Sequence, residues 1–417
     1  EGALRRAHLP EFPFEVAQLM AKQGLLGLTF DEADGGSGGT VFDAVLAIQE
    51  IALVCPRSAD VFQAGNFGPI RTCAEYATPE QKVRWLPRLL AGELVISLCM
   101  SEPEAGSAVT DLQTSATPEG NGFRVNGTKV FSSHSPEAEL FLVYVRYGPG
   151  MEGIGSVLIP RGAKDFTIGK PTRYVGGDDW CQLYFDNVYV PPEDVLLREG
   201  GFRKQIAAFN IERIGNAARA LAFGRHAFNI AREHALTRKQ FDRPLAEFQG
   251  LQWKFAEMQM KLDAGQLLLY RAAVNADNGF PSAQETAIAK AFCNEAGHWI
   301  SSEALQVMGG TGYSQETLVE YCFRRTRGWM IAGGSIEILK NRIAEGVFER
   351  SPALKFVWAD GAADLLTPFI WRMDCFGRPH LEQTPWAPRM PSDYLPGHVY
   401  FVQGSLDGPG DVDFAGE

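Results

Sequence analysis

The apolar residues change their spacing twice along the chain, and this feature constrains the fold most. Residues 1–96 and 201–350 carry apolar side chains three and four positions apart, the spacing of amphipathic helices. Residues 97–200 instead hold short alternating runs such as "GFRVNGTKVF" and "LFLVYVRY", separated by Gly, Asn, Asp and Pro. Because successive side chains of a strand point to opposite faces, this pattern predicts antiparallel β structure between two helical regions.

We therefore predict an α+β multidomain chain with an N-terminal helical domain (1–96), a central antiparallel β-barrel domain (97–200) and a C-terminal four-helix bundle (201–350). The first residue is Glu1 rather than Met, so the first helix is expected to be truncated. Residues 351–417 are rich in Pro, Trp and Asp and lack periodicity, which predicts an irregular C-terminal tail.

Composition excludes several classes of function. The chain has 417 residues, a net charge of −11 and no basic run, which argues against nucleic acid or an anionic membrane surface as a partner. No apolar run reaches the length of a membrane span and no signal-peptide pattern is present, so we expect a cytoplasmic protein. The seven cysteines are scattered without a CxxC pair and the histidines do not cluster, which predicts neither a disulfide framework nor a metal site.

Three stretches carry groups suited to ligand binding. In "SLCMSEPEAGSAVTDL", Ser101 and Ser107 lie where helices give way to strands, and domain junctions are frequent cofactor sites. In "TRKQFDRPLAEFQ", Arg238 and Arg243 flank an aromatic residue and could grip a pyrophosphate. In "QVMGGTGYSQE", close glycines allow a ligand to approach the backbone. Each stretch alone is equally compatible with an ordinary loop, a solvated helix end or a turn.

A fourth stretch, "IAGGSIEI", places Gly333 and Gly334 directly before a helix. Ser335 is its expected N-cap. Bare backbone at the positive end of a helix is suited to a ligand. The turn could be a simple hinge, or a place where a working side chain has been exchanged for glycine.

In this order and architecture, the four stretches resemble the FAD-dependent acyl-CoA dehydrogenases over about residues 1–350. The resemblance implies an oxidoreductase that desaturates an acyl-CoA thioester between Cα and Cβ in fatty-acid or branched-chain acyl metabolism. It also implies an electron-transfer flavoprotein as the electron acceptor. Because the family completes its FAD site across subunits, a homodimer or, more typically, a homotetramer is expected.

The resemblance also implies which positions bind the cofactor. The flavin ring would lie along residues 98–107, which begin at Leu98, and the main chain of Met100 and the hydroxyl of Ser101 would bond the isoalloxazine. Ser107 would lie near the CoA pantetheine or phosphates. The other implied positions are Phe131 and Ser133 in place of the usual Trp and Thr, Arg238, Gln240 and Phe241 toward the FAD of a neighbouring subunit, Gln306, Gly309 and Gly310 toward the adenosine end, and Ser335. Ala108 replaces the family's usual aspartate, which leaves the exact contacts open.

The family needs a carboxylate that takes the α proton while the β hydrogen leaves as hydride. In many members it is a glutamate at the position that matches Gly333, and glycine cannot take a proton. Isovaleryl-CoA and long-chain acyl-CoA dehydrogenases carry it instead on the first helix of the C-terminal domain, directly before an arginine. Glu212, followed by Arg213, matches that pattern, so we predict Glu212 as the catalytic base.

Arg213 would support the base, Phe209 and Asn210 would line the CoA side, and the Gly333 backbone would help to hold the thioester. Helical periodicity alone places Glu212 at the border of an apolar stripe, which also suits an ordinary surface glutamate. Glu337, inside the last helix, is a weaker candidate for the base.

Two other functions remain compatible with the sequence: a flavin-dependent oxidase or monooxygenase on the same fold, and a non-catalytic partner subunit of a heteromeric dehydrogenase. The sequence does not specify acyl chain length, branching or a ring system.

Residues from about 348 to 417 resemble an interior fragment of a TIM-barrel metal-dependent amidohydrolase, notably in "FERSPALKFVWADGAADLLTPFIWRMD". The metal-binding motifs of such enzymes are missing, so His380 and His398 are expected to be structural or exposed. A fragment without the rest of its barrel cannot bury a parallel strand, and we predict no catalysis from it. It would be a fusion, a sequence artefact or a piece of a longer two-enzyme chain.

Overall fold

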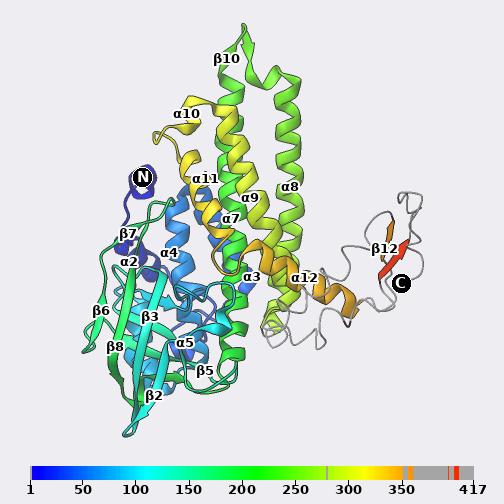
Figure 1. Cartoon of the computed structure of the whole chain (residues 1–417). Helices are drawn as coiled ribbons and strands as arrows, with labels where there is room; N and C mark the ends of the chain where they lie inside the picture. The colour runs from blue at the N-terminus through cyan, green and yellow to red at the C-terminus, as the bar shows by residue number, and fades with distance from the viewer. Residues whose placement is uncertain (1, 279, 351–355, 360–392, 394–398, 403–417) are drawn as a thin grey trace. The chain divides into compact units, whose positions relative to one another are not determined.

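The computed structural model describes residues 2–278, 280–350, 356–359, 393 and 399–402 (Figure 1). The chain divides into two compact units, residues 1–340 and 341–417, and each is described by itself. In the second unit, β12 (Phe356–Ala359) pairs in parallel with β13 (Val399–Val402). The rest of the segment that resembles an amidohydrolase, with His380 and His398, lies outside the described residues.

Helices form the first part of the chain, as the apolar spacing predicts. They are α1 (Ala3–Ala7), α2 (Phe14–Lys22), α3 (Val41–Val54), α4 (Pro56–Asn66), α5 (Pro69–Tyr76) and α6 (Pro79–Leu90), with a short 3-10 turn at Glu32–Asp34. Local sequence sets several of their starts. Capping boxes at Thr40 and Thr78 begin α3 and α6, and proline occupies the first turn of α4, α5 and α6.

The middle of the chain forms one sheet. Its strands are β1 (Ile96–Cys99), β2 (Ser115–Glu119), β3 (Gly122–Ser133), β4 (Leu140–Arg146), β5 (Ile154–Pro160), β6 (Phe166–Ile168), β7 (Thr172–Arg173), β8 (Asp179–Val190) and β9 (Val195–Leu197), with 3-10 turns at Val109–Asp111 and Pro192–Asp194. Along its main path the order is β6-β8-β3-β2-β4-β5-β9, with β1 also paired to β4 and β7 to β8.

The prediction of an antiparallel barrel is wrong in two respects. Among the described residues the path ends at β6 and β9, so the sheet is open. Each of these end strands has three residues, too few for the ladder that would close a barrel. The sheet is also mixed, because β1 and β2 pair with β4 in parallel. Arriving directly from the helical domain, β1 runs beside β4 from Ile96 opposite Leu140 to Cys99 opposite Val143.

The C-terminal helices form the expected bundle from α7 (Phe202–Thr237), α8 (Gln249–Val274), α9 (Ala283–Met308) and α11 (Leu318–Trp329) (Figure 1). The hairpin of β10 (Lys239–Gln240) and β11 (Arg243–Pro244) lies at the tip of α7 and α8, and short 3-10 turns occupy Leu245–Glu247 and Asn275–Asn278. Helices α10 (Gly310–Tyr313) and α12 (Ile336–Arg350) complete the set.

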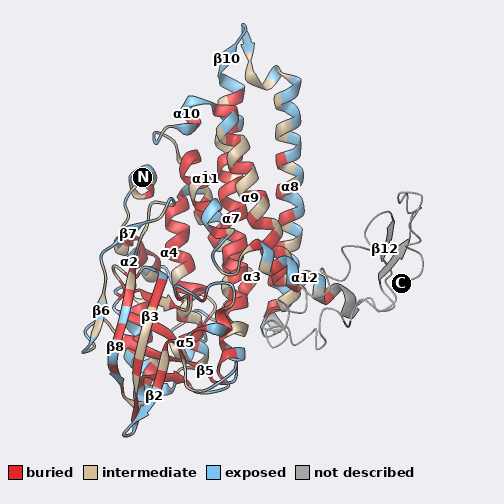
Figure 2. Ribbon diagram, viewed as in Figure 1, coloured by how far each residue is buried: buried red, intermediate tan, exposed pale blue. Residues whose placement is uncertain are grey.

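Helix α7 lies at the centre of this bundle and is buried over most of its length, whereas α8 keeps an exposed face (Figure 2). Helices α7 and α9 approach closely at a glycine: a Cβ added to Gly297 would lie 2.2 Å from the carbonyl oxygen of Ala220. This close crossing brings side chains of α9 against those of α7.

Candidate active site

Glu212 lies on α7 where the N-terminal helices pack against it. The Gln63 side chain of α4 donates a hydrogen bond from Nε2 to the carbonyl oxygen of Glu212 at 3.3 Å. A Cβ added to Gly215 would meet Gln63 Oε1 at 2.3 Å and the Phe67 ring at 2.4 Å, so the bare backbone there permits this packing. The Glu212 side chain is half-buried between buried neighbours, rather than displayed on an open helix surface.

This environment changes the acidity of Glu212. Burial raises the pKa of its carboxyl from the usual 4.5 to about 7, although the positive charges of Arg219, Arg213 and Lys290 oppose the rise. A carboxylate that titrates near neutral pH suits a general base. Glu337 differs, because it is exposed on α12 and hydrogen bonds from its own backbone and from Ser335 lower its pKa.

The turn at Gly333 and Gly334 faces α7 and leads into α12. We name it the diglycine turn. Its φ angles are +75° and +91°, in the left-handed region that favours glycine. The Ser335 hydroxyl accepts a hydrogen bond from the backbone N–H of Ile338 at 3.4 Å, in agreement with its predicted role as N-cap. In the part of the chain that the structure describes, the backbone N–H groups of Gly333, Gly334 and Ser335 donate to no other group. They can therefore donate to an acceptor oxygen of a ligand.

Two cationic side chains from different helices hold this turn. Arg213 of α7 donates from Nε to the carbonyl oxygen of Gly333 at 2.9 Å, and Lys290 of α9 donates from Nζ to that of Gly334 at 2.8 Å. The structure thus brings Arg213, which follows Glu212 in the chain, into contact with Gly333.

Lys290 is not among the site residues predicted from the sequence. A signal for it was present in "AIAKAFCNEAG", because Lys290 shares the buried face of its helix with Ala287 and Asn294, three positions before it and four after it. A lysine on such a face requires polar partners.

The residues predicted to line the CoA side gather around Arg213. Its guanidinium carbon lies 5.0 Å from the centroid of the Phe209 ring, and its Nη1 donates to Asn210 Oδ1 at 2.9 Å. All three side chains are buried. Ser107, in contrast, is exposed in the loop that follows β1.

A buried charge network lies beside this cluster and was not predicted. Asp60 of α4 accepts hydrogen bonds from Arg219 Nη1 at 2.7 Å and from Arg325 Nη2 at 2.9 Å, and Arg325 also pairs with Asp178 of the β domain. Arg219 is one of the cations that oppose the rise in the pKa of Glu212. The network therefore joins the N-terminal helices, the sheet and the bundle next to the carboxylate.

Comparison with known proteins identifies the family to which this architecture belongs. Three family models match in succession: the acyl-CoA dehydrogenase N-terminal domain over residues 3–93, the middle domain over 97–188 and the C-terminal domain over 199–348. The chain belongs to the acyl-CoA dehydrogenase family. It is an enzyme of that class, and its cofactor is FAD.

Relatives of this dehydrogenase include enzymes named for short-chain and for short/branched-chain substrates. It is 32% identical over 81% of its length to the short-chain specific acyl-CoA dehydrogenase of Clostridium acetobutylicum, covering 90% of that protein. It is 35% identical over 79% of its length to the bovine mitochondrial short/branched chain specific acyl-CoA dehydrogenase, covering 77%. The solved structure of butyryl-CoA dehydrogenase from Megasphaera elsdenii matches 83% of this chain and 93% of its own, with 29% identity and a TM-score of 0.78.

The residues expected to face the flavin lie on β1, just after it, and at the end of β3. Val130 N–H of β3 donates to the Ser101 carbonyl at 3.0 Å, and Ser97 Oγ donates to the Ser133 carbonyl at 2.7 Å. Leu98 in β1 and the segment that follows it, with Met100 and Ser101, are thereby fixed beside the end of β3.

At that end of β3, Phe131 is 59% exposed, and its ring centroid lies 4.6 Å from that of Trp180. The side chain of Ser133 is exposed two residues later. The exposed Phe131 ring, packed against the half-buried Trp180 and beside a hydroxyl, is a surface that a planar aromatic ring could cover.

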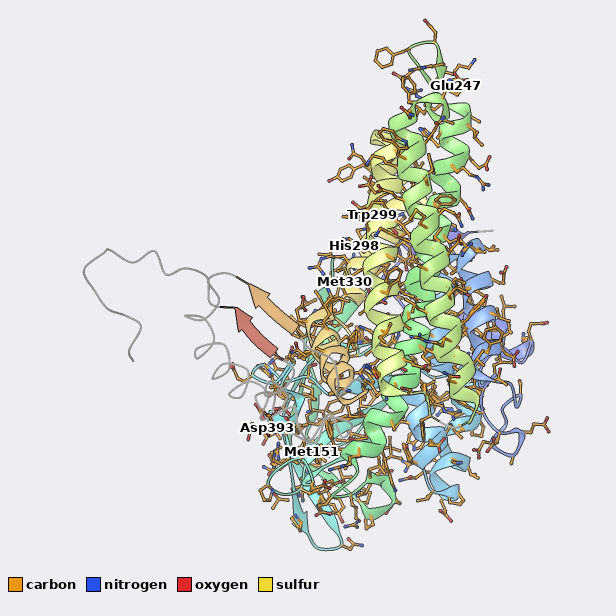
Figure 3. The ribbon with its side chains drawn as sticks, turned by 90° about the vertical axis from the view of Figure 1, so that its right-hand side faces the viewer. Met151, Glu247, His298, Trp299, Met330 and Asp393 are labelled. Atoms are coloured by element: carbon orange, nitrogen blue, oxygen red, sulfur yellow. The ribbon has the colours of Figure 1, made fainter. Side chains whose placement is uncertain are left out.

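The remaining predicted cofactor residues lie elsewhere in this dehydrogenase. Arg238, Gln240 and Phe241 are exposed on or beside the β10–β11 hairpin, where the Phe241 side chain is 89% exposed. Figure 3 shows Glu247 at this tip, whereas Met330, which follows α11 and precedes the diglycine turn, lies at mid-length of the bundle. At the C-terminal end of α9, Gln306, Gly309 and Gly310 are likewise exposed. One chain alone does not bring the hairpin residues to Glu212.

Among the described residues, no group of three or more His, Cys, Asp and Glu side chains has the arrangement of a metal site. No helix in the described part of the chain is long and apolar enough to cross a membrane.

Proposed function

We propose that this enzyme desaturates an acyl-CoA thioester between Cα and Cβ with Glu212 as the base. One observation carries the proposal: a half-buried carboxyl with a pKa of about 7 lies in the same cluster as a turn whose backbone N–H groups are unused. The usual position of the family's glutamate is Gly333 here, so Glu212 is the carboxylate available to the site.

In the proposed reaction, the N–H groups of Gly333, Gly334 and Ser335 bind the thioester carbonyl oxygen. Hydrogen bonds to that oxygen, together with the nearby charges of Arg213 and Lys290, stabilise the negative charge that develops when the α C–H bond breaks. Glu212 takes the α proton, and the electron pair forms the double bond as the β hydrogen leaves as hydride. When bound, FAD supplies the acceptor for that hydride, and Ser101, Phe131 and Ser133 would hold its ring system.

Two proposals concern partners. From the family resemblance we infer that an electron-transfer flavoprotein removes the electrons. We also infer a homo-oligomer in which Arg238, Gln240 and Phe241 reach the FAD of a neighbour. An exposed apolar stripe on α8 supports this, since Trp253, Met260 and Leu267 recur every seven residues and are 62%, 70% and 72% exposed.

The base assignment is tested by Glu212→Gln, which keeps the size of the side chain and removes its ability to take a proton. We expect the variant to bind FAD normally and to lose about 10²- to 10⁴-fold in the rate of anaerobic flavin reduction by acyl-CoA. Butyryl-CoA and 2-methylbutanoyl-CoA are the first thioesters to examine, and flavin absorbance is the readout. Glu337→Gln, at the exposed carboxylate on α12, is the matched control and should reduce at the parent rate. Near-parent reduction by Glu212→Gln would rule out Glu212 as the base.

The same experiment separates the other two functions. A dehydrogenase is reduced by acyl-CoA without oxygen and reoxidises slowly in air, whereas rapid reoxidation would favour an oxidase or monooxygenase. Failure to bind FAD, or to be bleached by any of a panel of straight, branched and cyclic acyl-CoA thioesters, would favour a non-catalytic subunit.

A further inference from the structure

We propose that Lys290 is a positioning residue of this site, which fixes the diglycine turn so that its backbone N–H groups face the thioester and which places a positive charge near Glu212. The proposal deepens the proposed function and rests on it, since it assigns a role at the same site to a side chain of α9.

The hydrogen bonds of Lys290 point to this role. The side chain is fully buried, and removing an ammonium group from water is costly unless its N–H groups are satisfied. Its Nζ donates to the carbonyl oxygens of Gly334 at 2.8 Å and Trp329 at 3.3 Å. Asn294, one helical turn later, donates from Nδ2 to the same Trp329 carbonyl at 2.7 Å. Lys290 therefore ties the diglycine turn, through Gly334, to the last residue of α11, Trp329.

The turn also leaves space for the lysine. A Cβ added to Gly333 would lie 3.2 Å from Lys290 Cε and 3.4 Å from Asn216 Nδ2. The side chain of Lys290 thus packs against the position where other family members carry a side chain. Glycine at 333 and lysine at 290 fit together.

Peptide geometry explains how this contact orients the donors. Arg213 holds the Gly333 carbonyl from α7, and Lys290 holds the Gly334 carbonyl from α9. In a trans peptide the C=O and the following N–H point in opposite directions. Holding the carbonyls of Gly333 and Gly334 therefore turns the N–H groups of Gly334 and Ser335 away from the two cations, and these N–H groups have no partner among the described residues.

Lys290 also acts on Glu212 through its positive charge. Burial, and then the charge of Arg213, lowers the pKa of Lys290 to about 7, while Glu212 favours the charged ammonium. Lys290 in turn favours the ionised form of Glu212. The other charged and titratable groups that interact with this pair are Arg213 and Arg219 on α7 and Tyr144 on β4. Asp60 on α4 is paired with Arg219.

The test measures thioester recognition by the holoenzyme. 2,2-Dimethylpropanoyl-CoA has no α hydrogen and cannot be desaturated, and the matching thioether, S-(2,2-dimethylpropyl)-CoA, lacks the carbonyl oxygen. We expect Lys290→Met to weaken binding of the thioester about ten-fold, the order of one lost hydrogen bond, while the thioether binds as to the parent. Lys290→Gln, which keeps one N–H donor, should recover part of the loss and provides a second variant if Lys290→Met folds poorly. Lys340→Met is the matched control, because Lys340 pairs at 2.7 Å with Glu295 of α9 at an exposed position.

Equal losses for thioester and thioether, or no loss for either, would overturn the positioning role. The charge is tested by the pH dependence of anaerobic flavin reduction, whose midpoint should move about one unit toward alkaline pH in Lys290→Met, since the carboxylate loses a favourable charge. An unchanged midpoint would contradict that part of the proposal. The binding experiment is repeated in the Glu212→Gln background, where the thioester selectivity should still depend on Lys290. If Glu212→Gln retains activity, the base assignment fails while the binding result still decides the role of Lys290.

Discussion

The rate of proton abstraction should follow the ionisation of Glu212 near neutral pH. Burial raises the pKa of this carboxyl from 4.5 to about 7 in the folded protein. Only the ionised form can accept a proton, so flavin reduction should be slow below pH 7 and rise through that value as the carboxylate forms.

The size of the effect follows from the titration. With a pKa of about 7, the ionised fraction is about one tenth at pH 6 and about nine tenths at pH 8, so the rate should rise about nine- to ten-fold between them. A carboxyl with a pKa of 4.5 would already be almost fully ionised at pH 6, and the rate would be nearly constant.

The raised pKa of Glu212 also lowers the stability of the folded state as pH rises. Below pH 4.5 the carboxyl is protonated in both the folded and the unfolded chain, and the shift has no effect. As pH rises toward 7, only the unfolded chain ionises freely, so the folded state loses stability, by about 3 kcal/mol at most. Glu212→Gln removes this loss and should be more stable than the parent at pH 8, but not at pH 4.5.

Stopped-flow absorbance under anaerobic conditions with saturating acyl-CoA, from pH 5.5 to 9, measures the rate. An α-deuterated thioester should slow it, which shows that proton abstraction is being observed. Urea unfolding of the apoprotein, parent against Glu212→Gln, measures the stability difference at pH 4.5 and pH 8. A rate that is flat between pH 6 and 8 despite a deuterium effect would refute the reasoning, as would a glutamine variant that gains no stability at pH 8.

Two further predictions concern backbone conformation and assembly. Gly333→Ala should lower the free energy of unfolding by about 1–2 kcal/mol, because its φ is +75° and the new Cβ would lie 3.2 Å from Lys290 Cε. Gly328→Ala, in α11 with nothing within 4 Å of an added Cβ, should instead be neutral or stabilising by up to about 1 kcal/mol, and equal losses in urea unfolding would contradict the argument. Met260→Glu should dissociate the proposed oligomer through a charge on the α8 stripe, measured by sedimentation. A parent protein that sediments as a single chain would refute that interface.

Local sequence predicted the elements well and their long-range pairing less well. Apolar spacing and turn residues indicate helices and strands because they act within a few residues, as Thr40 and Thr78 do at their capping boxes. The predicted closed barrel depended on which strands meet at the ends of the sheet. The parallel pairing of β1 with β4 joins segments about forty residues apart, from Ile96 to Leu140, and no local pattern encodes it.

The sequence by itself determined the three-part organisation, the N-cap at Ser335, and the absence of a carboxylate at Gly333 together with its presence at Glu212. These features are residue identities in local patterns, which can be read without coordinates. Only the tertiary structure decided the chemistry around Glu212, because burial and charge act through space. The raised pKa of its carboxyl depends on the helices that pack around α7, and the contact of Lys290 with the diglycine turn depends on the close approach of α7 and α9 at Gly297.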